Sequence, residues 1–227
     1  MSVRAKQIRT PPQPQQPDVT LGWQAQKSAS TRTQIIESAI KCFVEYGYSR
    51  TTTPLIAQKA GLSRGAMLHH FPSKLAVVTA AVEYLHAKRL RAFRKAVLKQ
   101  SESAAGDHVH QAVEAYWQHV RHPMFVAFFE LAVAARTDKE LADILKPAQE
   151  GFEREWYQSA LELFPEWKGS SGEKFELGFD LSRYVMEGMA ISFLTHKETE
   201  RDKRLLSYLE DKLKELAGLP PRPARGS

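Results

Sequence analysis

The side chains with the most chemical potential lie close together in KAGLSRGAMLHHFPSK, residues 59 to 74. Arg64 precedes two adjacent histidines, His69 and His70, and Lys74 closes the stretch. Neighbouring residues of a helix point about 100° apart, so the two histidines cannot share one metal ion. Guanidinium, ammonium and imidazole groups suit hydrogen bonds to phosphate oxygens and to base edges. The stretch therefore indicates a surface that binds nucleic acid.

Other candidate metal and catalytic residues form no recognisable set. A di-iron bundle needs two Glu-x-x-His tetrads, and Glu83 to His86 is a single copy. His119 and His122 have a spacing that can bind a cation, but surface histidines are the better interpretation, because Pro123 ends the helix there. The lone cysteine, Cys42, lies in an apolar stripe and suits an inert core. We expect no catalytic residue, no metal and no cofactor, and the enzyme class is disfavoured.

Two short helices must position the basic and imidazole groups. The first, TPLIAQKA, can take Thr51 or Thr52 as its N-cap and closes at Gly61. The second, RGAMLHHF, has Ser63 as its N-cap and ends before Pro72. Two helices joined by a tight glycine-containing turn are typical of a helix-turn-helix motif.

The apolar residues of the second helix decide which of its sides faces outward. Met67 and Phe71 are four residues apart, so they share the side that packs on the first helix. The opposite side can then enter the major groove, N-terminal residues first. For His70, a partly buried position beside Phe71 is as good an interpretation as DNA contact. The predicted DNA-binding residues are Thr52, Thr53, Ser63, Arg64, Gly65, Ala66, Leu68, His69, His70 and Lys74.

Longer segments flank this motif. An amphipathic helix is expected from Ser30 to Gly47, and a long helix from Lys74 to about residue 99. Residues 1–27 are rich in proline and glutamine, which predicts a disordered arm whose basic residues are an unbound tail or touch DNA backbone. Residues 218–227 are expected to be a disordered tail.

Charge is divided unevenly along the chain. Residues 1–98 hold 15 Lys and Arg against 4 Asp and Glu, a formal charge of +11, whereas the remainder carries −5. This division favours a module that binds a polyanion, joined to a body of another kind, although basic residues also simply solvate helices. No apolar run approaches the roughly 18 residues of a spanning helix. With one cysteine and no signal sequence, we expect a cytoplasmic protein without membrane contact.

The segment FVEYGYSRTTTPLIAQKAGLSRGAMLHHFPSKLAVVTAAV resembles the DNA-binding domain of the TetR family of transcriptional regulators, over about residues 31 to 82. Within it, IAQKAGLSRGAMLHHFPSK reproduces the family's IA, AG, S-x-G, HF and SK elements. The family usually has tyrosine where Leu68 stands, which puts one backbone contact in doubt. The resemblance implies an all-α homodimer with an N-terminal three-helix helix-turn-helix DNA-binding domain plus a helical ligand-binding and dimerisation body. It also implies that the dimer binds a palindromic operator, usually to repress transcription. A small molecule that enters the body then releases the protein from the DNA.

Further helices are expected at 107–121, 123–136, 138–164, 173–196 and 200–217, which places the DNA-binding domain at 28–75 and the body at 76–217. The body is rich in aromatic residues, which suits either plain core packing or a pocket for an apolar or aromatic effector. A polar anchor in such a pocket is open among His119, Glu130 and Arg136. The predicted ligand-binding residues are Trp117, Phe125, Phe128, Phe129, Trp156, Met186 and Met189.

Residues 173–217 are predicted to form the homodimer. Their apolar residues recur at helical spacing, among them Phe175, Leu205, Leu209 and Leu213, and two such helices from each subunit give a four-helix interface. The alternative is that these helices pack only within the subunit. A purely architectural DNA-binding protein would not need so large an aromatic and acidic body.

Overall fold

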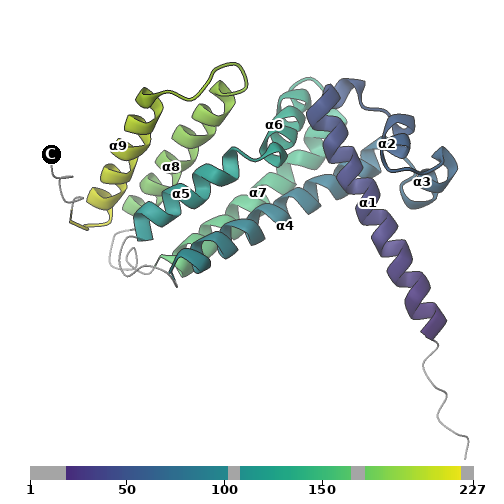
Figure 1. Ribbon diagram of the computed structural model, residues 1–227, viewed down its shortest axis with the longest axis horizontal. Helices are drawn as coiled ribbons and strands as arrows, with labels where there is room; N and C mark the ends of the chain where they lie inside the picture. Colours follow the sequence, from purple (N-terminus) through teal and green to yellow (C-terminus); the bar gives the residue numbers. More distant parts are fainter. Residues whose placement is uncertain (1–18, 102–107, 165–171, 221–227) are drawn as a thin grey trace, which may run out of the picture.

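The computed structural model describes residues 19–101, 108–164 and 172–220, and these residues form helices without any strand. The all-α prediction is confirmed. Figure 1 shows the helices in chain order. Their bounds are α1 Val19–Arg50, α2 Thr53–Lys59, α3 Arg64–His70, α4 Lys74–Ser101, α5 His108–Val120, α6 Pro123–Ala135, α7 Lys139–Leu163, α8 Gly172–Ser192 and α9 Glu200–Leu216.

The molecule is elongated, with two different ends. The helices α1, α2 and α3 form one end, and α8 and α9 lie at the other (Figure 1). Between them, α4 runs from the first end into the body, where it packs on α5 and α7. One helix therefore joins the two parts that the charge division separates.

The first helix begins earlier than expected. Residues 19–27, which the composition assigned to a disordered arm, are helical and continue directly into the amphipathic segment. Between Pro17 and Pro54 the chain has no proline, and Gln, Ala and Lys are good helix formers. The hydroxyl groups of Thr31 and Thr33 also donate to the carbonyl groups one turn earlier, of Lys27 and Ala29. The rest of the predicted arm, and residues 221–227 of the predicted tail, lie outside the described residues.

Gly47 bends the chain near the end of α1. Its φ of 77° and ψ of 163° are accessible essentially only to glycine. The bend aims the Tyr48 N–H group at α6, where it donates to Glu130 Oε1 over 2.8 Å. A Cβ atom at position 47 would lie 2.8 Å from the same oxygen. The glycine therefore allows α1 to make close contact with the body.

The apolar core consists of two clusters connected through α4. The first joins α1, α2 and α3 with the start of α4, with Leu131 of α6 and with Leu141 of α7. The second fills the body and includes Phe93 of α4. The predicted domain boundary at residue 75 is consequently not a gap in packing, because body residues complete the core of the first three helices.

Candidate nucleic-acid interface and body cavity

Local backbone bonds set the geometry of α2 and α3. The Thr52 hydroxyl accepts the Leu55 N–H at the start of α2, and the Ser63 hydroxyl accepts the Ala66 N–H at the start of α3. Between the helices Gly61 has a φ of 66°, which favours glycine in the tight turn. Gln34 of α1 donates to the Ala60 carbonyl group and holds this turn against α1. The predicted helix-turn-helix motif is present.

The two sides of α3 differ as the residue spacing predicted. Met67 and Phe71 are 0% and 1% exposed and belong to the first core cluster. The outer side is open: Arg64, Gly65 and His69 are exposed. Ala66 is also exposed, whereas Leu68 and His70 are partly buried. The short helix therefore presents one polar surface and buries the other.

The outer surface of α3 carries the hydrogen-bond donors Arg64 and His69 beside the open position of Gly65. Nothing lies within 4 Å of the position that a Cβ of Gly65 would occupy, so another backbone can approach closely there. The rings of His69 and His70 lie edge to face with their centroids 5.6 Å apart, which is not a shared metal geometry. The His70 carbonyl group accepts a hydrogen bond from Arg32 of α1 over 3.1 Å. Arg64 and His69 thus remain the donors best placed to meet a ligand.

Lys74 begins α4 as predicted, but its ammonium group is bonded within the protein. Its Nζ donates to the Tyr48 carbonyl oxygen over 2.6 Å and lies 3.8 Å from the centroid of the Tyr48 ring. Burial lowers the pKa of this ammonium group. We therefore correct the interpretation of Lys74 as a phosphate contact: the bend at Gly47 brings a carbonyl acceptor within its reach, and Lys74 links α4 to α1.

Comparison with known proteins identifies the helix-turn-helix segment. Residues 35–81 match the profile of the bacterial regulatory proteins of the tetR family. This segment is that of a TetR-family regulator. The match assigns the chain to transcriptional regulators and not to enzymes.

The similarity to some individual regulators extends beyond residues 35–81. The HTH-type transcriptional regulator CymR of Pseudomonas putida is 28% identical over 191 residues, which cover 80% of this chain and 88% of CymR. The HTH-type transcriptional repressor Rv1474c of Mycobacterium tuberculosis is 48% identical over 46 residues, which span only 25% of that relative. Among solved structures, a putative TetR-family regulator from Mesorhizobium loti superimposes with a TM-score of 0.65 at 18% identity. It covers 84% of this chain and 95% of the other.

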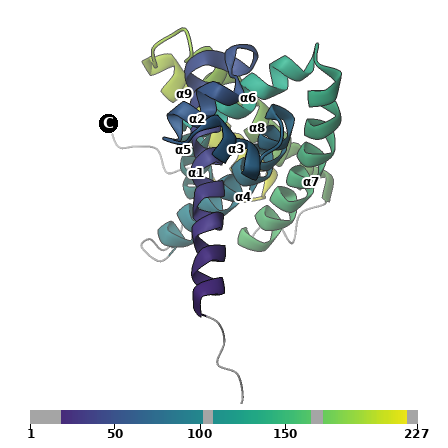
Figure 2. The same cartoon turned by 90° about the vertical axis from the view of Figure 1, so that its right-hand side faces the viewer.

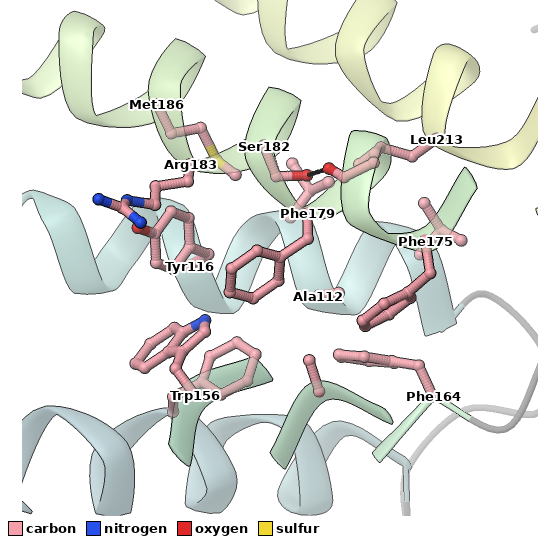
Figure 3. A pocket seen from close by; sticks show the side chains of 15 residues that line it. Ala112, Tyr116, Trp156, Phe164, Phe175, Phe179, Ser182, Arg183, Met186 and Leu213 are labelled. Atoms are coloured by element: carbon pink, nitrogen blue, oxygen red, sulfur yellow. Dashed lines mark hydrogen bonds between the residues drawn. The ribbon is translucent and has the colours of Figure 1, made fainter. Parts of the chain in front are cut away.

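The body contains a small, partly open cavity among α4, α5, α7 and α8, with Leu213 of α9 in its wall. Its volume is about 80 Å³. Figure 3 shows the rings of Phe164 and Phe175 at one end, and Tyr116 and Arg183 at the other. The cavity is therefore apolar over most of its length and polar at one end.

Only two of the seven predicted ligand-binding residues line this cavity. Trp156 and Met186 line it. Phe125 and Met189 are buried in the second cluster, and Trp117 lines an open groove beside α9. Phe128 packs on the guanidinium of Arg89, and Phe129 is partly buried away from the lining. Helical periodicity identifies apolar residues but not which of them leave space between helices.

None of the three predicted polar anchors lines the cavity. Glu130 accepts the Tyr48 N–H, Arg136 is an exposed C-cap of α6, and His119 accepts from Arg89. The polar residues of the lining are Tyr116, Ser182 and Arg183.

Carboxylates surround the polar end of the cavity. Arg183 lies 2.8 Å from Glu153 and 3.8 Å from Glu187. The Tyr116 hydroxyl donates to Glu187 over 2.9 Å. Burial, together with the negative charge of Glu187, raises the pKa of Tyr116 well above its usual value. The end of the cavity therefore offers both donors and acceptors to a bound molecule.

Behind this end lies a buried polar group that the sequence did not reveal. Arg89 of α4 is 2% exposed, and its Nε donates to His119 Nε2 over 2.9 Å. Among the described residues its nearest carboxylate, Glu187, is 4.0 Å away, and its Nη1 has no hydrogen-bond partner there. Burial lowers the pKa of Arg89. A possible signal is that Leu85 and Phe93 flank Arg89 at four-residue spacing, which places it on the apolar side of its helix.

The remaining candidate metal residues have other roles. His122 caps α6, with its Nδ1 accepting the Met124 N–H. Glu83 is exposed whereas His86 is buried, so the tetrad does not converge. Within the described residues, no group of three or more possible metal ligands occurs. In the same part of the chain, no helix is long and apolar enough to cross a membrane.

The far end of the molecule exposes large apolar side chains. Leu177 and Tyr184 project from α8, and Leu205 and Tyr208 from α9, with Tyr184 62% exposed. By contrast, Phe175, Leu209 and Leu213, which the sequence assigned to the dimer, are buried within the subunit. Gly188 of α8 has open space at its Cβ position. An apolar surface with room for a close neighbour therefore remains on α8 and α9.

Proposed function

We propose that this regulator is a ligand-responsive repressor that binds a palindromic operator as a homodimer in the cytoplasm. The observation that carries the proposal is the polarity of α3: Met67 and Phe71 are buried while Arg64, Gly65 and His69 face outward. In a helix-turn-helix protein this outer side enters the major groove.

Each proposed contact follows from the chemistry of its side chain. Arg64 donates to guanine or to phosphate, and Gly65 lets the helix backbone approach the DNA. The hydroxyl groups of Thr52, Thr53 and Ser63 lie at helix starts, where phosphate oxygens are favoured. His69, the exposed Ala66 and the partly exposed Leu68 and His70 complete the surface. Leu68 can pack on a thymine methyl group but cannot donate to phosphate.

Replacement of Arg64 by alanine tests this surface. We expect operator affinity to fall by about 1–3 kcal/mol, because a bidentate base contact is lost. Fluorescence anisotropy with a duplex selected from genomic fragments measures the loss. Thermal stability and dimerisation should not change, because Arg64 is exposed. The charge-matched control is Arg154→Ala, an exposed position of α7. Unchanged operator affinity of Arg64→Ala would refute the proposed recognition side.

The exposed apolar surface of α8 and α9 supports the dimer. Two α3 helices must reach half-sites about 34–36 Å apart, which a single subunit cannot do. Burial of Leu177, Tyr184, Leu205 and Tyr208 against their copies removes apolar area from water. Two helices from each subunit then form a four-helix interface.

Introducing a charge into this surface should produce monomers. We expect Tyr184→Glu to dissociate the dimer, because four-helix contact would bury the carboxylate without a partner. Light scattering coupled to size exclusion gives the mass directly. Leu98→Glu is the matched control, since Leu98 is an exposed apolar residue of α4 in the body. A dimer that persists in Tyr184→Glu at micromolar concentration would place the interface elsewhere.

The cavity supports binding of an apolar or aromatic effector with a polar group at one end. About 80 Å³ is much smaller than the roughly 300–1,000 Å³ of sites for drug-sized ligands. Such a ligand must therefore move the surrounding helices apart, and it binds the expanded state better than the compact one. Because Phe93 of α4 lines the cavity and Lys74 of α4 contacts Tyr48, expansion can reach the DNA-binding end through this helix.

Filling the cavity should block the effector and spare the operator. Ala112 lies in the cavity wall, so the larger side chain of Ala112→Leu would occupy its space. We expect the neutral aromatic probe N-phenyl-1-naphthylamine to bind at least about tenfold more weakly, which corresponds to a loss of about 1.4 kcal/mol of binding free energy. The fluorescence of the probe measures its binding. Ala132→Leu on the exposed side of α6 is the control. Equal probe binding by Ala112→Leu and the wild type would exclude this cavity as the effector site.

A further inference from the structure

The first turns of α1 project from the rest of the molecule. Residues 22–30 are all exposed, and from residue 22 onward Ile35 is the first to be fully buried. In Figures 1 and 2 this part of α1 extends away from the neighbouring helices. At 1.5 Å per residue, residues 19–30 add about 18 Å of helix. Tertiary packing does not explain why so polar a segment is retained as a helix.

The projecting turns have the surface of a polyanion-binding element. Residues 19–36 contain Lys27 and Arg32 but no Asp or Glu. The other polar side chains there are Gln, Ser and Thr, which hydrogen-bond readily to phosphate oxygens. Trp23 is 61% exposed, and the Lys27 ammonium group lies 5.1 Å from its ring centroid. A large aromatic residue beside a cation suits a partner that offers both negative charge and flat apolar edges.

Direct contacts attach the base of this projection to the recognition helix. Arg32 donates through Nη1 to the His70 carbonyl group at the end of α3. Its guanidinium lies 4.1 Å from the ring centroid of the buried Phe71. Gln34, two residues later, bonds to the turn between α2 and α3. The projection is therefore continuous with the proposed DNA-binding surface and is held in a definite direction from it.

We propose that residues 19–31 of α1 form a second DNA-binding element, which contacts the duplex outside the half-site read by α3. The inference rests on the proposed operator binding and extends it. Lys27 neutralises a backbone phosphate, neighbouring glutamine side chains donate to phosphate oxygens, and Trp23 packs against deoxyribose. These contacts read no base, so the element lengthens the footprint and adds affinity without adding sequence preference.

The test compares two duplexes with the full chain. Both carry the same palindrome, selected from a random-sequence library, and one adds about 10 base pairs, one helical turn, on each side. Wild-type protein should bind the longer duplex about tenfold more tightly, as expected for one or two added phosphate contacts. The double variant Trp23→Ala/Lys27→Glu should lose this difference and keep its affinity for the short duplex. Lys146→Glu, an exposed lysine of α7, should behave as wild type.

The outcomes separate this inference from the proposed function. Two outcomes would overturn the second element alone. In one, the wild type binds both duplexes specifically and with equal affinity. In the other, the double variant still prefers the longer duplex. Absence of specific binding to either duplex would overturn operator recognition and this inference together. Because both substituted residues are exposed, circular dichroism and thermal unfolding should match the wild type. A loss of affinity for the short duplex as well would place the element within the half-site and refute the outer contact.

Discussion

An Arg89→Ala variant should lose about 2–5 kcal/mol of unfolding free energy, as other large-to-small core substitutions do. The guanidinium lies 4.9 Å and 4.5 Å from the ring centroids of Phe128 and Phe152, so truncation leaves a cavity between them. His119 also loses the donor to its Nε2. Urea unfolding followed by far-ultraviolet circular dichroism measures the difference.

The same position should accept methionine. Arg89→Met keeps most of the volume and removes a buried charge whose nearest carboxylate is 4.0 Å away. It also removes the unpartnered Nη1 donor. Replacement of poorly compensated buried charge by apolar groups is often neutral or stabilising. We therefore expect Arg89→Met to stay within about 1 kcal/mol of the wild type, the size of one lost hydrogen bond. A methionine variant as unstable as the alanine variant would show that the charge itself stabilises the fold.

Acidification should destabilise the protein below about pH 6.5, the usual pKa of histidine. Burial, followed by the charge of Arg89, lowers the pKa of His86 to about 4 and that of His119 to about 3. The unfolded chain therefore binds more protons than the folded one between these values and pH 6.5. The stability that comes from the two neutral rings is complete above pH 6.5 and is lost as the pH falls. Each ring contributes up to about 1.4 kcal/mol per pH unit.

Urea unfolding at pH 7.5 and pH 5.0 measures this loss, which should reach roughly 3–4 kcal/mol for the two rings together. This window lies largely above the usual titration range of surface carboxylates. His119→Gln retains an acceptor for Arg89 and should remove about half of the pH dependence. His86→Gln should remove a similar share. A free energy of unfolding that is equal at both pH values would mean that both rings take up protons in the folded protein.

The recognition helix could be predicted from the sequence because its determinants are local. The spacing of Met67 and Phe71 establishes the buried side of α3, and the Ser63 cap establishes its start. The left-handed glycine at position 61 marks the turn in the same way. Hydrogen bonds and side-chain contacts within one or two helical turns carry this information, so position along the chain is sufficient.

Contacts between helices distant in sequence decided the remaining features. Lys74 binds the Tyr48 carbonyl group because the bend at Gly47 brings it there, and Arg89 meets residues from four other helices. Both the exposed stripe of α8 and the cavity behind it are made from apolar residues that helical spacing alone cannot tell apart. Periodicity predicts which residues share a side of a helix. The contacts of that side depend on where the other helices lie, so only the three-dimensional packing determines them.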